Sequence, residues 1–247
     1  MELSEFFRSH PRCALGFSGG ADSAYLLYAA VKSGAEVLPV YVNSAFQPGF
    51  ELEDAARLCR ELDVELQVVE VDVLCDENIA ENPENRCYFC KKRIFEALKE
   101  KALSLGYTVV IDGTNASDIA GDRPGMRALG ELSVLSPLRD CGITKPRLRE
   151  LSREAGLFTW DKPAYACLAT RIPSGERITA DKLFRIEAAE NELFKMGFTD
   201  FRVRTPEGRA RLQFPADQLK RGEELFEEIS RRLSPWFTDI SIDPNTR

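Results

Sequence analysis

Short apolar runs alternate with helical patterns along the first 160 residues, and this alternation constrains the fold more than any other feature of the sequence. The apolar runs predict strands over residues 13–17, 36–42, 65–71 and 107–111, and residues 133–135 could add a fifth. Helical periodicity predicts helices over 21–33, 51–62, 88–105 and 144–155. Because strands separated by helices need crossover connections, we predict an α/β domain with a doubly wound parallel sheet. Such sheets bind ligands at the carboxyl ends of their strands.

The pattern changes near residue 160. Residues 161–178 contain two prolines and a glycine and show no clear period, which indicates a functional loop. The remaining residues predict helices over 180–196 and 216–233 and strands over 198–204, 209–214 and 236–242. We therefore expect three parts: a ligand-binding domain over 1–160, the loop over 161–178, and a smaller α+β domain over 179–247 that binds substrate or mediates oligomerisation.

The histidine content limits the chemistry that is available to this chain. His10 is the only histidine, and we expect it to lie in an N-terminal tail. Ser-His-Asp triads, Cys-His pairs and multi-histidine metal sites are therefore not expected here. Any catalysis has to use carboxylates, lysine, arginine, cysteine or bound cofactors.

The charge balance and the cysteine content indicate the setting in which the protein works. The 33 basic and 40 acidic side chains give a net charge of −7, which argues against a large nucleic-acid-binding surface but does not exclude a local patch. No apolar run approaches the ~20 residues of a membrane span, and the N-terminus does not resemble a signal peptide. With seven cysteines, an odd number, we expect a reduced, cytoplasmic protein that does not contact a membrane.

The string Ser18-Gly-Gly-Ala-Asp-Ser23 follows the first predicted strand and opens the first predicted helix. Its glycines allow backbone amides to approach an anion, and a helix N-terminus favours negative charge at that point. Asp22 is suited to holding a Mg²⁺ ion that bridges phosphates. For the two glycines alone, a plain tight turn is the alternative interpretation.

This string resembles the PP-loop of the adenine-nucleotide α-hydrolase superfamily. The resemblance implies a Rossmann-like fold and cleavage of ATP between its α and β phosphates, with release of pyrophosphate. Adenylation makes chemical sense, because a carboxylate or amide oxygen is a poor leaving group and AMP is a good one. The resemblance assigns ATP binding to Ser18, Gly19, Gly20, Asp22 and Ser23.

A second polar motif, Asp112-Gly-Thr-Asn-Ala-Ser-Asp118, follows the fourth predicted strand. It therefore lies at a carboxyl end, where we expect it to face the first motif. An ordinary helix cap with an Asx turn is the alternative. In PP-loop enzymes a similar G-T-N-x-x-D segment lines the nucleotide site, and by this resemblance the candidates are Gly113, Thr114, Asn115 and Asp118.

Three of the cysteines stand in contexts that favour function over packing. Cys87-Tyr-Phe-Cys90 places two sulfurs on one side of a turn, and a single pair of this kind fits zinc, half of an iron–sulfur site or a redox couple. Cys167 lies in the irregular loop, near Arg171. We expect the other four cysteines to be ordinary core residues: Cys13, Cys59, Cys75 and Cys141.

Arg202 and Arg204 alternate along a predicted strand, so we expect both side chains on one face of it. Paired guanidinium groups bind phosphate bidentately. The alternative is a solvated strand face.

Taken together, the motifs resemble those of the LarE family over nearly the whole chain. They are S-G-G-A-D-S, N-P-E-N-R-C-Y-F-C-K, D-G-T-N-A-S-D with R-P-G-M-R-A-L, K-P-A-Y-A-C-L-A-T-R-I-P-S-G-E-R-I-T and the R-V-R strand. The resemblance implies that carboxylates of pyridinium-3,5-biscarboxylic acid mononucleotide are adenylated and converted to thiocarboxylates. This reaction belongs to the synthesis of the nickel-pincer nucleotide cofactor of lactate racemase.

The family has two sulfur sources. In one, a single cysteine at the position of Cys167 gives up its own sulfur and becomes dehydroalanine. In the other, three cysteines hold a 4Fe–4S cluster whose fourth iron carries sulfide. Cys87, Cys90 and Cys167 fit the cluster version, which we favour.

The resemblance also implies roles for particular residues and for partners. It assigns catalysis to Cys167 and Asp22. The cofactors that it implies are ATP, Mg²⁺ and the 4Fe–4S cluster. It assigns substrate binding to Arg171, Glu190, Arg202 and Arg204. It further implies a homo-oligomer, which is a hexamer in this family, and contact with other enzymes of the pathway.

Three other functions compete with this one. tRNA thiolation also pairs a PP-loop with a three-cysteine cluster, but the net charge of −7 and the lack of zinc-ribbon cysteines argue against it. An ATP-dependent amidating ligase with a structural zinc has no obvious fourth ligand in this sequence. A nucleotide-sensing module would need the PP-loop but not Cys167.

Overall fold

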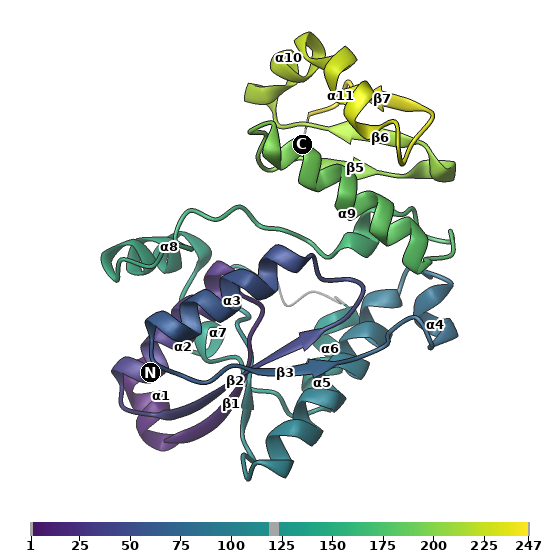
Figure 1. The fold of residues 1–247 in the computed structure, drawn as a ribbon. Helices are drawn as coiled ribbons and strands as arrows, with labels where there is room; N and C mark the ends of the chain where they lie inside the picture. The colour runs from purple at the N-terminus through teal and green to yellow at the C-terminus, as the bar shows by residue number, and fades with distance from the viewer. Residues whose placement is uncertain (1, 119–123, 247) are drawn as a thin grey trace. The chain divides into compact units, whose positions relative to one another are not determined.

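The computed structural model describes residues 2–118 and 124–246, which form two compact units. Unit 1 comprises Met1–Val73 and Asn85–Lys162, and unit 2 comprises Leu74–Glu84 and Pro163–Arg247. Each unit has its own β-sheet (Figure 1). In the part of the chain that the structure describes, no helix is long and apolar enough to cross a membrane.

Unit 1 is built on a four-stranded parallel sheet with the strand order β3-β2-β1-β4. Its strands are β1 (Arg12–Gly16), β2 (Glu36–Asn43), β3 (Gln67–Glu70) and β4 (Val110–Ile111). The chain moves outward from β1 to β3 and then returns to place β4 on the other side of β1. Such a reversal creates the crevice in which open α/β sheets bind their ligands. The predicted doubly wound parallel sheet is therefore confirmed.

Helices cover both faces of this sheet (Figure 1). Right-handed crossovers place the helices of the outward path on one face and those of the return path on the other. The first face carries α2 (Ala21–Lys32) and α3 (Gly49–Glu61), and the second carries α5 (Arg86–Ser104) and α6 (Pro124–Glu131). Buried Leu15 of β1 packs with Leu26 of α2 and Leu58 of α3 in the main core.

The ends of unit 1 differ from the sequence prediction. Residues 3–9 form helix α1 (Leu3–Ser9) rather than a tail, and His10 is its C-cap residue. The helix forms because its apolar residues recur at helical spacing and are buried in the core, namely Leu3, Phe6 and Phe7. Two further helices complete the unit, α7 (Pro137–Asp140) and α8 (Lys145–Glu154). The predicted fifth strand is a single parallel bridge between Leu135 and Ile111.

Unit 2 contains a small mixed sheet with the order β5-β6-β7. The strands are β5 (Arg202–Arg204), β6 (Ala210–Gln213) and β7 (Ile240–Ile242), and β6 runs antiparallel to β5 and parallel to β7. The helical elements are α4 (Glu77–Ala80), η1 (Leu168–Arg171), α9 (Ala180–Lys195), η2 (Pro206–Gly208), α10 (Ala216–Glu224) and α11 (Phe226–Leu233).

Two local features of unit 2 explain how its helices begin and end. Thr179 caps α9, as predicted, because its side chain accepts a hydrogen bond from the backbone of Lys182 at 3.2 Å. The single helix predicted over 216–233 is instead two helices, α10 and α11. They meet at Leu225, whose φ of −99° and ψ of 10° depart from helical values.

Candidate functional site

The loop between β1 and α2, Ser18–Ser23, is held by its own serines. The Ser23 hydroxyl donates to the carbonyl of Gly20 at 3.2 Å and accepts from the backbone of Ser18 at 3.3 Å. Gly19 has a φ of +68°, and a Cβ at this position would lie 2.6 Å from the carbonyl oxygen of Glu51. Only glycine fits that turn, which leaves the N-terminus of α2 open toward the carboxyl edge of the sheet.

The second motif follows β4 and approaches the first. A Cβ on Gly113 would lie 2.9 Å from the backbone nitrogen of Ser23, so the two backbones come together only because this residue is glycine. Buried Asp112 supports the turn by accepting hydrogen bonds from the hydroxyls of Thr114 at 2.5 Å and Ser136 at 2.7 Å. The two motifs therefore face each other, as the sequence predicted.

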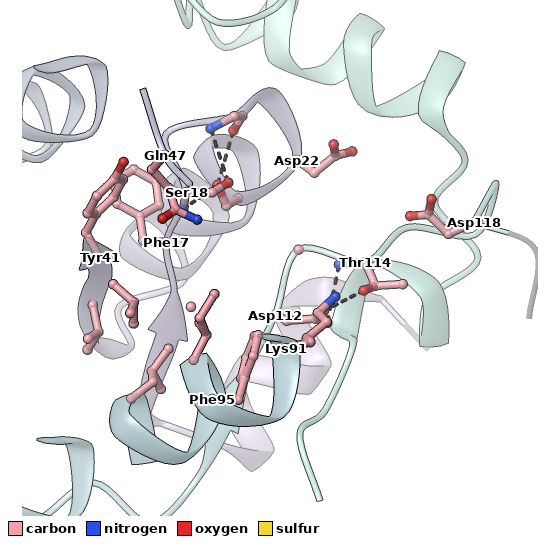
Figure 2. Close-up of a pocket in the computed structure, with 18 residues that line it drawn as sticks. Phe17, Ser18, Asp22, Tyr41, Gln47, Lys91, Phe95, Asp112, Thr114 and Asp118 are labelled. Atoms are coloured by element: carbon pink, nitrogen blue, oxygen red, sulfur yellow. Dashed lines mark hydrogen bonds and ion pairs between the residues drawn. The ribbon is translucent and has the colours of Figure 1, made fainter. Parts of the chain in front are cut away.

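Between the motifs lies a cavity of about 330 Å³, entirely within unit 1 (Figure 2). One end is polar and one end apolar: Figure 2 shows Asp22 and Asp118 at one end and Phe95 of α5 at the other. Predicted residues from both motifs line it, namely Ser18, Gly20, Asp22, Ser23, Gly113, Thr114 and Asp118. Residues that the sequence analysis did not single out complete it, among them Phe17, Tyr41, Gln47, Lys91 and Phe95.

Two predicted residues, Gly19 and Asn115, do not line the cavity. Gly19 allows the turn of the loop, and Asn115 contacts Asp22. The Asn115 amide donates to Asp22 Oδ1 at 3.1 Å. Asp22 Oδ2 also pairs with Lys145 Nζ at 2.5 Å. Sequence reasoning missed Lys145, which begins α8. The backbone of Lys145 is bonded to the hydroxyl of Ser117 at 2.8 Å, and this bond ties the helix start to the second motif.

Lys91 is a cation that lines the cavity itself. Its ammonium group lies 4.0 Å from Asp112 Oδ2 and 5.8 Å from the ring centre of Phe95. It follows directly on Cys90 in the first turns of α5, so the helix that carries the C-x-x-C pair also lines the cavity. The motif that includes residues 123–129 begins at Arg123, which lies outside the described residues.

The seven cysteines divide into different environments. Cys13 and Cys59 are buried as predicted, and burial raises the pKa of both thiols to about 12. The expectation of a core position is wrong for Cys75, which is exposed, while Cys141 is only partly buried. Within the C-x-x-C pair Cys87 is exposed and Cys90 is buried.

Cys87 and Cys90 belong to unit 1 and Cys167 to unit 2. Over residues 2–118 and 124–246, no three His, Cys, Asp or Glu side chains gather in a group that could hold a metal ion. The chemistry of the donors nonetheless suits iron: all three are cysteines, and the thiolate is the usual ligand of iron–sulfur clusters.

Unit 2 brings the predicted Cys167, Arg171, Glu190, Arg202 and Arg204 into one network. Arg171 and Glu190 form a fully buried, two-pronged ion pair with distances of 2.9 and 3.1 Å. Arg202 is buried and Arg204 is exposed, and both guanidinium groups donate to the loop that carries Cys167. The Cys167 side chain is partly exposed at the start of η1.

Burial and charge act in opposite directions on the two buried arginines. Burial lowers the pKa of Arg171, but the hydrogen bond and the charge of Glu190 outweigh burial, so the pKa is raised overall. Burial, followed by the charge of Arg171, lowers the pKa of Arg202 to about 10. The hydrogen bonds of the Arg202 guanidinium run to the backbone carbonyls of Phe201 and Ala164.

A parallel sheet whose first strand leads into such a glycine-rich loop, facing a second polar motif across a cavity, defines the class of PP-loop enzymes that use ATP. A family model described as "Queuosine biosynthesis protein QueC" matches residues 12–82, from β1 to α4. Over 235 residues the chain is 31% identical to the pyridinium-3,5-bisthiocarboxylic acid mononucleotide synthase of Lactiplantibacillus plantarum, covering 94% of this chain and 85% of that protein. The chain belongs to the LarE family and is an ATP-dependent sulfur transferase.

Two uncharacterised proteins are similar over comparable lengths. Protein slr1717 of Synechocystis is 38% identical over 221 residues, which cover 88% of this chain and 82% of that protein. Protein MJ0830 of Methanocaldococcus jannaschii is 30% identical over 241 residues, which cover 98% and 92%. Each of the three alignments is longer than either unit, so the similarity extends into both units.

Proposed function

We propose that this enzyme converts carboxylates of pyridinium-3,5-biscarboxylic acid mononucleotide to thiocarboxylates at the expense of ATP. The observation that carries the proposal is that one chain contains both a cavity suited to ATP and a partly exposed cysteine. Unit 1 holds a cavity with the features of an adenylation site, and unit 2 holds a partly exposed cysteine in a loop fixed by arginines. The similarity to the L. plantarum synthase over most of both chains supports this substrate.

The cavity suits Mg²⁺-ATP in its size and in the arrangement of its ends. The apolar end, with Phe95 and Val42, suits the adenine base. The polar end offers the backbone amides at the N-terminus of α2 to the phosphates. Asp22 is the carboxylate placed to hold the metal ion, and Lys145, now paired with it, is then available to the phosphates.

Adenylation balances without a protein base. A substrate carboxylate oxygen attacks the α-phosphorus of ATP, and a new P–O bond forms. The bond between the α-phosphorus and the bridging oxygen breaks, so pyrophosphate leaves with its electron pair. Because the carboxylate is already ionised, no proton has to be removed, which agrees with the absence of any histidine other than His10 from the sequence. In this proposal Lys91, which lines the cavity, and Lys145, which pairs with Asp22, offset charge on the phosphates.

Sulfur replaces AMP on the activated carboxyl carbon in the second half of the reaction. The residues that would hold a 4Fe–4S cluster are Cys87, Cys90 and Cys167, and this cluster, when bound, would supply the sulfide. Three protein ligands leave one iron without a cysteine, which suits a carrier of additional sulfide. Arg202 and Arg204, with Arg171 and Glu190 behind them, form the proposed set for the anionic substrate.

The experiment that tests the proposal separates the two half-reactions. The full-length protein, prepared without oxygen, is given ATP, Mg²⁺ and the biscarboxylate mononucleotide, and pyrophosphate and thiocarboxylate are measured in the same sample. Cys167→Ser is expected to release pyrophosphate but to form no thiocarboxylate. Cys75→Ser, which removes an exposed cysteine outside the proposed set, is expected to retain both. Thiocarboxylate formation by Cys167→Ser would overturn the proposal.

The source of sulfur can be determined from the metal and sulfide content of the protein and from its intact mass after turnover. About four irons and about four or more acid-labile sulfides per chain would support the cluster. A colourless protein that takes up neither, and that loses the mass of one H₂S during turnover, would instead make Cys167 a sacrificial donor. Stoichiometric zinc would contradict both sulfur sources. Light scattering of the same preparation tests the proposed homo-oligomer against the 27.8 kDa of one chain.

A further inference from the structure

The backbone around Cys167 accepts hydrogen bonds from several side chains. Residues 161–167 lie outside any helix or strand, and the Cys167 carbonyl accepts from the backbone and the hydroxyl of Thr170 at 3.0 and 2.8 Å. Three arginines donate further hydrogen bonds to carbonyl groups on both sides of the cysteine. The bonds run from Arg202 to Ala164 O at 2.7 Å, from Arg171 to Ala166 O at 2.7 Å and Cys167 O at 3.3 Å, and from Arg204 to Thr170 O at 3.2 Å.

Tyr165 lies at the centre of this arrangement. Its ring centre is 4.4 Å from the guanidinium carbon of Arg171 and 5.1 Å from that of Arg202. Its hydroxyl donates to Glu190 Oε2, the same oxygen that receives Arg171. The Tyr165 side chain thus contacts the guanidinium groups of Arg171 and Arg202 and also the carboxylate of Glu190, which projects from α9.

Glu190 transmits this contact to the sheet. Its Oε1 accepts from Arg171 Nε at 2.9 Å and from the backbone of Val203 at 2.9 Å. Val203 is the middle residue of β5, which carries Arg202 and Arg204. The position of Glu190 therefore sets both the direction of the Arg171 fork and the distance between the Cys167 loop and β5.

Glu190 Oε2 has two donors, the Tyr165 hydroxyl and, at 3.1 Å, Arg171. Because Glu190 is buried, removing one of these two hydrogen bonds to its carboxylate is costly.

We propose that Tyr165 is a positioning residue for Cys167: its hydroxyl fixes Glu190, Glu190 fixes Arg171, and Arg171 fixes the backbone that presents the thiol. The proposal rests on the proposed function, in which Cys167 takes part in sulfur transfer. It gives the ring and the hydroxyl of Tyr165 separate tasks. The ring spaces the two guanidinium groups, and the hydroxyl sets the orientation of the ion pair.

Unit 1 offers a matched control. Tyr107 also has a guanidinium over its ring, that of Arg12 at 4.2 Å, and its hydroxyl also donates to a glutamate, Glu36 at 2.8 Å. It lies just before β4, at the amino ends of the strands, and the cavity lies at the carboxyl ends. Tyr107→Phe removes the same chemical group from the same kind of network without touching the Cys167 loop.

The first arm of the test measures the Cys167 thiol in protein free of metal. Alkylation of Cys167 by iodoacetamide is followed by peptide mass spectrometry, with Cys75 as the internal reference. Tyr165→Phe is expected to raise the alkylation rate of Cys167 several-fold, and Tyr165→Leu, which also removes the ring, to raise it further. Tyr107→Phe is expected to leave it unchanged. Equal rates in Tyr165→Phe and the unsubstituted protein would overturn the proposal, provided that both melt at similar temperatures.

The second arm measures turnover. In Tyr165→Phe the rate of thiocarboxylate formation is expected to fall by about ten- to hundredfold, because a small misplacement of a reacting group is sufficient for such a loss. Pyrophosphate release and the KM for ATP are expected to stay unchanged, which a general loss of folding would not allow. If the unsubstituted protein forms no thiocarboxylate, the proposed function fails, but the alkylation arm still decides the role of Tyr165. An equal fall in both products would show that Tyr165 is merely structural.

Discussion

Gly113 is the residue at which the two motifs that line the cavity meet. A side chain at this position would lie 2.9 Å from the backbone nitrogen of Ser23 and 3.2 Å from its Cα. Both are backbone atoms that cannot rotate away, so Gly113→Ala has to push the second motif from the PP-loop. Overpacking of this kind costs about 1–3 kcal/mol. We therefore expect Gly113→Ala to weaken binding of a non-hydrolysable ATP analogue by about ten- to hundredfold, as measured by titration calorimetry.

Gly130 provides the control for that substitution. It lies in α6 with an ordinary backbone conformation, and a Cβ at this position would meet nothing within 4 Å. Gly130→Ala is expected to bind the analogue as the unsubstituted protein does and to be as stable or slightly more stable, because alanine favours a helix over glycine. Unchanged affinity in Gly113→Ala would mean that the two loops do not need to approach so closely to bind nucleotide.

The glycines and acids of the two motifs could be predicted because their chemistry is local. Gly19, Gly20 and Asp22 act in the loop where they stand in the sequence. Lys145 was missed because nothing in its own surroundings marks it, and it lies 123 positions from Asp22 in the sequence, so only the folded chain brings the two together. Tyr165 was missed for the same reason, because its partners come from η1, α9 and β5.

At the scale of elements, the amino ends of three strands are fastened by one surface cluster. Arg12 begins β1, Glu36 begins β2 and Tyr107 precedes β4. Glu36 Oε1 accepts from Tyr107 at 2.8 Å and from Arg12 at 3.0 Å. These two hydrogen bonds, that of Tyr107 first, lower the pKa of Glu36 from its usual value of 4.5. The cluster therefore stabilises the folded state only while Glu36 is ionised.

The sign of the pH dependence follows from that lowered pKa. The contribution of Glu36 is complete above the unfolded-state value of 4.5 and is lost as the pH falls through the lower folded-state value. We expect Glu36→Gln to lower Tm modestly at neutral pH, since the pair is exposed, and the difference from the unsubstituted protein to shrink below the unfolded-state value. Calorimetry across the acid range measures this. A Tm difference that stays constant in acid would contradict the assignment.

Strand positions were predicted correctly where the apolar pattern of the sequence matches the burial of the strand. β1 and β2 are buried on both faces, so their apolar runs are continuous and their positions were predicted within a residue or two. β4 is shorter than predicted, and the backbone N–H of Tyr107 donates to the carbonyl of Ala102 in α5 at 2.9 Å instead of to a neighbouring strand. The break between α10 and α11 was missed because the sequence has helical character on both sides of Leu225.

At the scale of the whole molecule, long-range contacts decide which segment belongs to which unit. The segment Leu74–Glu84 interrupts unit 1 in the sequence but belongs to unit 2. The Asn82 amide donates to the carbonyls of Pro173 at 2.8 Å and Ile172 at 3.3 Å. Such contacts join residues about ninety positions apart in the sequence. No local sequence pattern in the segment Leu74–Glu84 predicts that it belongs to unit 2.

The chain passes from unit 1 to unit 2 immediately before the Cys167 loop, and both sides of this point are anchored. In unit 1, Lys162 Nζ donates to the carbonyl of Gly19 at 3.2 Å and pairs with Asp54 at 2.6 Å. Arg149 holds the carbonyl of Lys162 at 3.0 Å. In unit 2, Arg202 holds the carbonyl of Ala164. The ammonium group of Lys162, near the start of the loop over 161–178, thus contacts the PP-loop directly.

This anchor leads to a prediction about coupling between the two half-reactions. Lys162→Met keeps the aliphatic stem and removes the hydrogen bonds to Gly19 and Asp54, so the start of the Cys167 loop loses its connection to the PP-loop. We expect the ratio of thiocarboxylate formed to pyrophosphate released to fall several-fold, because adenylate that does not receive sulfur is lost to water. Lys99→Met is the control, since Lys99 also binds a backbone carbonyl in unit 1, that of Leu132 at 2.8 Å. If the two products of Lys162→Met fall in equal proportion, Lys162 serves the ATP site alone, and the ordering of sulfur transfer after adenylation has to come from elsewhere in the chain.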